Sequence, residues 1–354
     1  MRPRGDVAFA FAAGNGEVGA FVPPAGFLML TFHAADILKS VPVDVAGAGM
    51  PDDIVWIDAH SPTDAEVAFL KRAVGAEPPS LDRMMEIESS SRLYRTRDAL
   101  FATIPLTKHE TSGASVTVPL AFVVAPKALV TVRYDEVKSC APAQVGAMLG
   151  DRSIDGPFGV LITILETIVD HIADELERVT AALDANSHAI FADLSSGGGP
   201  KTKGGGARAT LVKLGQARDF TSHIAESLLS LGRMSSFIVG EAAHALPGEA
   251  RARFERLDRD VVSLTGHESR LSEKVQFLLD ASLGLIGVEQ NDIFKILTMV
   301  SVVGIPPTLI ASMYGMNFKN IPEYDWVWGY QYGLGLIVLS ALLPLLWFKW
   351  RRWW

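Results

Sequence analysis

Oxygen-bearing side chains, with a few apolar ones between them, recur at steps of three and four residues from residue 291 into an uncharged stretch near the C-terminus. Such steps place side chains on one face of an α-helix. We call this face the polar stripe, and its members are Asn291, Phe294, Thr298, Ser301, Ile305, Thr308 and Ser312. Toward the N-terminus the same spacing adds Phe277, Asp280, Gly284 and Gly287. Because amide and hydroxyl oxygens accept hydrogen bonds, such a row suits the water shell of a hard cation.

Two interpretations of the polar stripe are open, because a polar face within lipid meets either neighbouring helices or water. In the first, small and hydroxyl residues let membrane helices pack closely. In the second, several copies of the chain line a pore, since two spans per chain cannot enclose one. The pore would suit a hydrated Mg²⁺ ion, which loses its waters reluctantly. Apolar rings at Phe294 and Ile305 would gate it by dewetting.

The chain has two long apolar segments near its C-terminus: the first contains most of the polar stripe, and the second comes after it. The runs 296–318 and 326–348 each contain 23 residues without a charge or a histidine, and seven residues separate them. A membrane helix needs about 20 such residues. The sequence therefore predicts two transmembrane helices joined by a tight loop, without an intramembrane proton relay. The alternative is a pair of buried helices in a soluble domain, but soluble helices rarely run this long without charge.

The charges that flank the two segments predict their orientation. Lys295 precedes the first segment, and Lys349, Arg351 and Arg352 follow the second among three tryptophans. Basic flanks stay in the cytoplasm, and tryptophan favours the membrane interface. Both ends of the chain are therefore expected in the cytoplasm, with the connecting loop outside.

The composition narrows the class of protein. The 354 residues are 49% hydrophobic and 20% charged, which excludes a disordered chain. The net charge is −8, divided between −11 in the first 292 residues and +3 in the rest. An acidic body attracts cations and argues against nucleic acid as a partner. The single cysteine, Cys140, excludes an internal disulfide and a cysteine-based metal site.

Residues 1–155 predict a cytoplasmic α/β domain. Short apolar and β-branched runs read as strands at 27–32, 54–58, 100–106, 116–125 and 128–134. A helix is expected after residue 61, where Ser61 or Thr63 with Glu66 provides a capping signal, and a second one at 79–88. The basic and apolar start of the chain, residues 2–13, resembles a signal peptide, but its apolar run is short and favours a first strand.

The remainder of the chain is predicted to be helical. Residues 156–248 form a helical pair interrupted by a Gly-rich linker at 195–206, which lacks the residue order of a phosphate-binding loop. Residues 249–313 form one helix of about 65 residues, or roughly 95 Å, whose membrane part begins near residue 293. Such a helix needs partner helices from its own chain or from other copies. The outer segment, the second span and a basic tail follow as 314–325, 326–348 and 349–354.

One acidic cluster has the spacing of a metal site. Its members share one helix at i, i+3 and i+4 steps and are Asp170, His171, Asp174, Glu175 and Glu177. A solvated acidic helix face is the favoured interpretation, because such faces are common. The sequence shows no ATP motif and no arrangement of a nucleophile with a base, so an enzyme is not expected.

The end of the first span resembles the CorA family of magnesium and cobalt transporters. The first span ends in Tyr314-Gly315-Met316-Asn317, and the family signature is a Gly-Met-Asn triplet at this place. The following Pro322-Glu323 pair, the Trp and Gly-Tyr residues after it and the basic aromatic tail fit the same family. Weaker similarity covers residues 54–66, 86–94 and 119–133.

This resemblance implies an α+β membrane protein that assembles as a homopentamer. Its cytoplasmic domain would form a funnel, a long stalk helix would continue into the first span, and that span would line the pore. The transported ion would be Mg²⁺, with Co²⁺ or Ni²⁺ as further substrates, and the membrane potential would drive it. The resemblance also implies the cell inner membrane, closure by cytoplasmic Mg²⁺ and no organic cofactor.

The resemblance assigns roles to residues of the pathway. Gly315, Met316 and Asn317 would form the outer mouth, where the Asn317 amide oxygen meets the ion's water shell and Tyr314 braces the structure. Without the family, Gly315 and Asn317 would simply end a helix. The other implied positions are a cytoplasmic ring at Asn291, apolar gates at Leu297 and Ile305, and an acidic stalk position at Asp280.

Two acidic groups outside the pore are also candidates. Glu323 and Asp325 of the outer loop would concentrate cations, or they are simply solvated. By resemblance, a regulatory Mg²⁺ site would lie between subunits, with Asp82, Glu86 and Glu88 opposite Asp258 and Asp260. Arg256 and Arg259 depart from the family pattern there.

Two rival functions stay open. The first is a zinc transporter of the same superfamily, although the Pro322-Glu323 pair favours the magnesium branch. The second is a membrane-anchored cytoplasmic sensor that conducts no ion.

Overall fold

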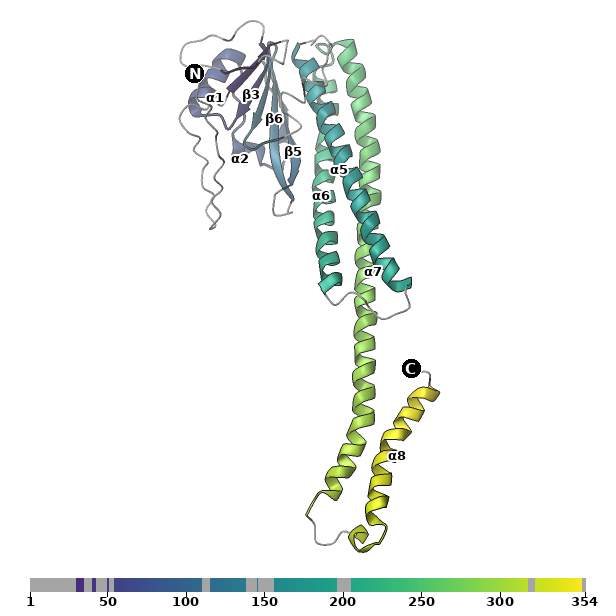
Figure 1. Ribbon diagram of the computed structural model, residues 1–354. Coiled ribbons are helices and arrows are strands. Elements are labelled where there is room, and N and C mark those ends of the chain that lie inside the picture. The colour runs from purple at the N-terminus through teal and green to yellow at the C-terminus, as the bar shows by residue number, and fades with distance from the viewer. Residues whose placement is uncertain are drawn as a thin grey trace, which may run out of the picture. The chain divides into compact units, whose positions relative to one another are not determined.

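The computed structural model describes residues 30–34, 40–42, 50, 54–109, 115–137, 145, 156–195, 205–317 and 322–351 (Figure 1). The first strand expected within residues 7–13, Cys140 and most of the Gly-rich linker lie outside these ranges. The chain forms two compact units. Unit 1 comprises residues 1–105, 118–168 and 230–258, and unit 2 comprises residues 106–117, 169–229 and 259–354.

A seven-stranded mixed sheet has the order β2-β1-β3-β7-β6-β5-β4. The strands are β1 Leu30–Ala34, β2 Ser40–Pro42, β3 Ile54–His60, β4 Leu93–Arg95, β5 Leu100–His109, β6 Ser115–Val124 and β7 Leu129–Arg133. The pairing of β3 with β7 is parallel, whereas β1·β2, β1·β3, β4·β5 and β6·β7 are antiparallel. The sequence missed β2 and β4, because three residues are too few to show a period of two.

Helix α1, Asp64–Val74, lies beside the sheet in unit 1 (Figure 1). Thr63 caps it: the Thr63 backbone N–H donates to Glu66 Oε2 at 2.8 Å, and the Glu66 N–H donates to Thr63 Oγ1 at 3.4 Å. This capping box resolves the choice between Ser61 and Thr63. Phe69 and Leu70 of α1 join the core against the sheet.

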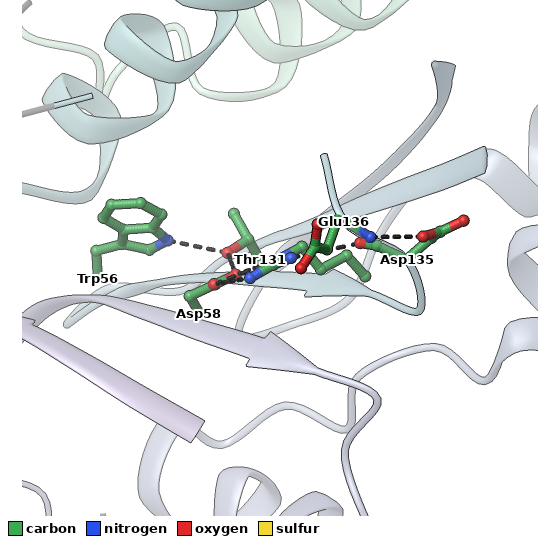
Figure 2. A network of polar contacts seen from close by, with 6 residues as sticks. Trp56, Asp58, Thr131, Asp135 and Glu136 are labelled. Atoms are coloured by element: carbon green, nitrogen blue, oxygen red, sulfur yellow. Dashed lines mark hydrogen bonds and ion pairs between the residues drawn. The ribbon is translucent and has the colours of Figure 1, made fainter. Parts of the chain in front are cut away.

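The parallel pair at the centre of the sheet carries a polar chain of contacts (Figure 2). The Trp56 indole N–H donates to Thr131 Oγ1 at 3.0 Å, and that hydroxyl donates to Asp58 Oδ1 at 2.9 Å. Arg133 Nη2 lies 2.9 Å from Asp58 Oδ2. Because each buried polar atom depends on its neighbour across the strands, a slipped register would leave several unsatisfied.

The prediction of one helix at residues 79–88 is wrong, because the structure has two shorter helices in this region. Residues Leu81–Met84 form α2 and Ser89–Arg92 form α3, each four residues long. Ser80 caps α2 and Met84 is buried. The Arg92 Nε donates to the Glu86 carbonyl oxygen at 2.6 Å, so this carbonyl serves a side chain rather than a helical N–H.

Three long helices follow: α5 Gly156–Ser195, α6 Gly205–Glu241 and α7 Gly248–Tyr314. In unit 1, Arg253 of α7 is buried and holds Glu166 of α5 with two hydrogen bonds of 3.0 and 2.6 Å. In unit 2, two residues of α5 contact α7: Thr180 forms a hydrogen bond with His267, and Asp184 accepts one from Lys274. Arg218 of α6 donates a hydrogen bond to Ser272 of α7. The chain therefore supplies its own partner helices for this part of α7.

Among the described residues, three helices are long and apolar enough to cross a membrane. In α5 the apolar window is 61% buried, whereas it is 0% buried in α7 and 11% buried in α8, Gly329–Trp350. The apolar face of α5 is thus used for packing within the protein. The two segments expected from the sequence are the ones that leave their apolar surface uncovered in this chain.

Candidate functional site

The polar stripe lies on the face of α7 that α8 does not cover. Of its members, Phe294 and Ile305 are each 64% exposed and Ser301 is half-buried; the gate candidate Leu297, next to the stripe, is 60% exposed. The remaining members, Asn291, Thr298, Thr308 and Ser312, are exposed. At 100° per residue the other half-buried positions of the span point the opposite way. These positions are Met299, Val303, Pro306, Pro307, Ile310 and Tyr314.

Helix α8 runs antiparallel beside the C-terminal part of α7 in unit 2 (Figure 1). At one end, Gly333 of α8 is buried, and a Cβ added there would lie 3.8 Å from the Tyr314 ring. Toward the other end, Val302 of α7 lines one groove together with Leu343 and Trp347 of α8. Packing against α8 within one chain therefore does not account for the stripe.

The hydroxyl groups of the stripe are oriented by their own helix. Thr298 Oγ1 donates to the Phe294 carbonyl at 2.7 Å, Ser301 Oγ donates to Leu297 at 2.8 Å, and Thr308 Oγ1 donates to Gly304 at 2.8 Å. Each of these three hydroxyl groups donates its single hydrogen to a backbone carbonyl, and the lone pairs of its oxygen remain available to accept hydrogen bonds. Such oxygens can accept hydrogen bonds from the water of a hydrated cation.

The Gly-Met-Asn triplet begins at the end of α7. The Gly315 N–H donates to the Ala311 carbonyl at 3.0 Å, and the Met316 N–H donates to Met313 at 3.3 Å. A Cβ at position 315 would stand 3.3 Å from the Ala311 oxygen, so glycine allows this tight helix end. Asn317 is exposed. Gly315 can therefore end the helix while Asn317, two residues later, exposes its amide group, so one motif can have both roles.

The loop between the two apolar helices contains the short 3₁₀ helix η2, Pro322–Asp325. Asp325 is exposed and Glu323 is half-buried. The Glu323 carbonyl accepts from the Trp326 N–H at 3.3 Å, and a Cβ at Gly329 would overlap this carbonyl oxygen. Gly329 and Gly333 are positions that sequence reasoning missed, although the Gly-Tyr pair after the loop pointed to the first of them.

The N-terminal end of the stripe is rich in charge. Gln276 Nε2 donates to Asp280 Oδ1 at 3.1 Å, and Lys295 Nζ lies 3.0 Å from Asp292 Oδ1. Asn291 and Asp280 are both exposed. The Asp292–Lys295 pair thus places one charge of each sign beside the Asn291 position.

The regulatory candidates are accessible in the single chain. Asp82, Glu86 and Glu88 are exposed, Asp258 is half-buried, and Asp260, which belongs to unit 2, is exposed. Within the described part of the chain, no three His, Cys, Asp or Glu residues are arranged to hold a metal ion.

The acidic cluster that begins at Asp170 is not a metal site among these residues. Glu175 pairs with Arg178 one turn further along α5, and His171 Nε2 lies 3.6 Å from Glu175 Oε1. Arg178 takes up the carboxylate that a metal would need. The solvated-face interpretation, favoured from the sequence, also needs correction for Glu175, which is only 8% exposed.

Comparison with known proteins places these features in a family. The chain matches the family described as CorA-like Mg²⁺ transporter protein over residues 51–351. The magnesium transport protein CorA of Salmonella typhimurium strain LT2 is 30% identical over 302 residues, which cover 85% of this chain and 92% of that protein. The CorA protein of Escherichia coli strain K12 is 30% identical over 300 residues, covering 84% and 92%.

The fold agrees with this assignment. The solved structure of the CorA magnesium transporter from Methanocaldococcus jannaschii superposes with a TM-score of 0.69 at 20% identity, over 90% of this chain and 96% of that chain. The family match indicates a transmembrane transporter and not an enzyme. The structural match shows the shared fold of an α/β domain, long helices and C-terminal apolar helices. The chain belongs to the CorA-like Mg²⁺ transporter family.

Proposed function

We propose that this protein carries Mg²⁺ across the cell inner membrane through a pore that five copies of the chain line with the polar stripe. The observation that carries the proposal is the position of the stripe among the exposed residues of α7, opposite Tyr314, which packs against Gly333 of α8. An inside-negative potential would drive the ion, at about 4.6 kcal/mol per 100 mV for two charges. Both termini would lie in the cytoplasm, as the basic flanks indicate.

The pathway would handle a hydrated ion from one end to the other. Glu323 and Asp325 would raise the cation concentration at the outer loop, and the Asn317 oxygen would bind the ion's water shell. The hydroxyl oxygens of the stripe would then replace bulk water as acceptors. Apolar rings at Phe294, Leu297 and Ile305 would close the pore by dewetting, with Asn291 and Asp280 on the cytoplasmic side.

Cytoplasmic Mg²⁺ would act as a negative regulator of the pore. In this proposal Asp82, Glu86 and Glu88 of one subunit share the ion with Asp258 and Asp260 of the next. Because a bound cation screens repulsion between carboxylates, its loss would loosen the subunit contacts and favour the open state. Arg256 and Arg259 stand close in sequence and would weaken binding at this site.

Flux through purified protein in liposomes tests the main proposal. Mg²⁺ entry under an inside-negative potassium diffusion potential, followed by a trapped indicator, is expected to be fast for the unmodified protein. Asn317→Ala is expected to lower the rate about tenfold or more, because each subunit then loses the hydrogen bond between the Asn317 amide oxygen and the water shell of the Mg²⁺ ion. Gln331→Ala removes an exposed amide from the start of α8 and serves as the matched control.

The same vesicles separate the rival functions. A protein that passes no Mg²⁺ at any potential is the non-conducting sensor, and the proposal is then wrong. Competition between Mg²⁺, Co²⁺, Ni²⁺ and Zn²⁺ ranks the ions, and transport of Zn²⁺ alone would identify the zinc branch. Loading the vesicles with Mg²⁺ on the side of unit 1 is expected to reduce the rate if the regulatory site exists.

A further inference from the structure

An apolar groove opens between α7 and α8 near the C-terminal end of α8. It has a volume of about 600 Å³, and the residues that line it are Val302, Leu343, Pro344, Leu346, Trp347 and Trp350. All six side chains are apolar or amphipathic. The volume falls within the range of small-ligand sites, about 300–1,000 Å³. In a membrane helix such a hollow is filled by a lipid chain or by another protein segment.

Positive charge stands at one end of this groove. The Arg351 guanidinium lies 5.8 Å from the ring centroid of Trp347, a groove residue. Lys349 is exposed on the same helix end, and neither it nor Arg351 forms an ion pair with a carboxylate in the part of the chain that the structure covers. In the sequence Arg352 follows directly. Lys349 and Arg351 are therefore available to an external anion.

Tryptophan and arginine together indicate the depth of this end in the membrane. Tryptophan rings favour the interface between lipid tails and headgroups, and arginine at such a depth reaches the phosphate layer. The groove would therefore begin at the headgroups and continue into the hydrocarbon. An amphiphile with an apolar tail and an anionic head fits both parts.

We propose that this groove binds an anionic phospholipid, with one acyl chain against Leu343 and Trp347 and the phosphate group against Arg351. The proposal rests on α7 and α8 lying in the membrane and not on the ion pathway. A zwitterionic lipid would fill the apolar part equally well but would gain less from the cations. Charge complementarity is thus what selects the occupant.

Native mass spectrometry of the full-length protein with added lipid tests the proposal. Palmitoyl-oleoyl phosphatidylglycerol is expected to bind more tightly than the matching phosphatidylcholine. Each basic residue near an anionic surface contributes about a fivefold preference, so Arg351→Gln is expected to lower it by about fivefold. Binding of phosphatidylcholine, whose phosphate is balanced by its own choline group, should fall by less in this variant.

A second pair of variants tests the groove itself. Leu343→Trp fills the hollow and is expected to abolish the retained lipid, whereas Leu334→Trp adds the same ring to α8 outside it. The two leucines are 56% and 52% exposed, so their surroundings are comparable. If Leu343→Trp fails to fold, Val302→Phe fills the groove from the α7 side.

Three results would overturn the proposal. Equal binding of the two lipids would exclude selection by charge, and unchanged lipid retention in Leu343→Trp would exclude the groove. The third result has two parts: the unmodified protein retains no lipid, and Leu343→Trp no longer forms the oligomer. Together they would show that the groove is a contact between subunits. Mg²⁺ flux of the same variants in phosphatidylcholine vesicles is measured separately, so failure of lipid binding is distinguished from failure of transport.

Discussion

Glu268 is a buried carboxyl group in α7, and only 6% of its surface is exposed. Burial raises the pKa of Glu268 above its ordinary value of 4.5, while the nearby Arg218 guanidinium opposes that shift. The folded state therefore binds a proton more readily than the unfolded state. The favourable contribution of this proton is complete below pH 4.5 and is lost as the pH rises through the raised pKa.

Glu268→Gln is accordingly expected to stabilise the protein at neutral pH. The amide is uncharged at every pH, so the gain should be largest above the raised pKa and should vanish below about pH 4.5. Thermal unfolding midpoints measured between pH 4 and pH 8 test this. Glu273→Gln, at an exposed position of the same helix, is the control. A gain that does not depend on pH would show that burial of charge is not the cause.

Gly329 depends on a close backbone approach rather than on a special backbone angle. A Cβ at this position would overlap the Glu323 carbonyl oxygen, whereas a Cβ at Gly335 would meet nothing within 4 Å. Overpacking of this kind typically costs about 1–3 kcal/mol. The loop that carries Glu323 would have to move away from the start of α8.

Gly329→Ala is therefore expected to lower the unfolding midpoint and to reduce Mg²⁺ flux. Gly335→Ala places the same methyl group on the same helix and should change neither quantity. Differential scanning fluorimetry and the liposome assay measure the two effects. Equal behaviour of the two variants would exclude a role for the contact with η2.

At the scale of elements, α7 performs two tasks along one continuous helix. Its residues before about 280 pack against helices of the same chain, through pairs such as Asp184 with Lys274 at 2.5 Å. Its apolar window further on is 0% buried. The change from covered to uncovered surface occurs within one helix, Gly248–Tyr314.

A matched pair of serines tests whether the stripe faces the ion. Ser301 Oγ donates to the Leu297 carbonyl at 2.8 Å, and Ser340 Oγ of α8 donates to Ile337 at 2.7 Å. Both serines lie within apolar helices, but only Ser301 belongs to the polar stripe. Ser301→Ala is expected to lower Mg²⁺ flux about fivefold, the value of one hydrogen bond of about 1 kcal/mol.

Ser340→Ala should transport at the unmodified rate in the same assay. If both variants lose the same fraction of activity, the hydroxyls serve helix packing. If neither changes, the stripe does not contact the hydrated ion.

At the scale of the whole molecule, a single chain leaves a polar helix face uncovered in a region destined for lipid. Polar surface in hydrocarbon is costly, and association around an aqueous axis removes that cost. The two-span chain cannot form the axis alone. The assembly is therefore part of the proposed site and not an addition to it.

Crosslinking tests this arrangement, and the single native cysteine makes it simple. In a Cys140→Ser background, Ser312→Cys is expected to crosslink between copies with a short bismaleimide reagent, because stripe residues converge on one axis. Leu346→Cys, 62% exposed on α8, is expected to crosslink much less. Bands on a denaturing gel measure both. Stronger crosslinking from Leu346→Cys would place α8 at the axis and contradict the pore.

Local pattern alone was enough for much of this protein. The uncharged runs, the steps of three and four in the polar stripe and the Gly-Met-Asn triplet are properties of single segments. The predicted long helix from residue 249 to residue 313 corresponds to α7, Gly248–Tyr314, for the same reason. Helical periodicity over many turns is a strong signal, and charge within a span is nearly forbidden by the membrane.

Other features were decided by contacts between distant segments. The position of α8 opposite the stripe, the overlap that requires Gly329 and the burial of the apolar face of α5 cannot be read from one segment. The same holds for β2, β4 and the broken helix at 79–88, where short elements follow their neighbours rather than their own propensity. Periodicity tells which residues share a face of a helix, but only packing determines which other surface that face meets.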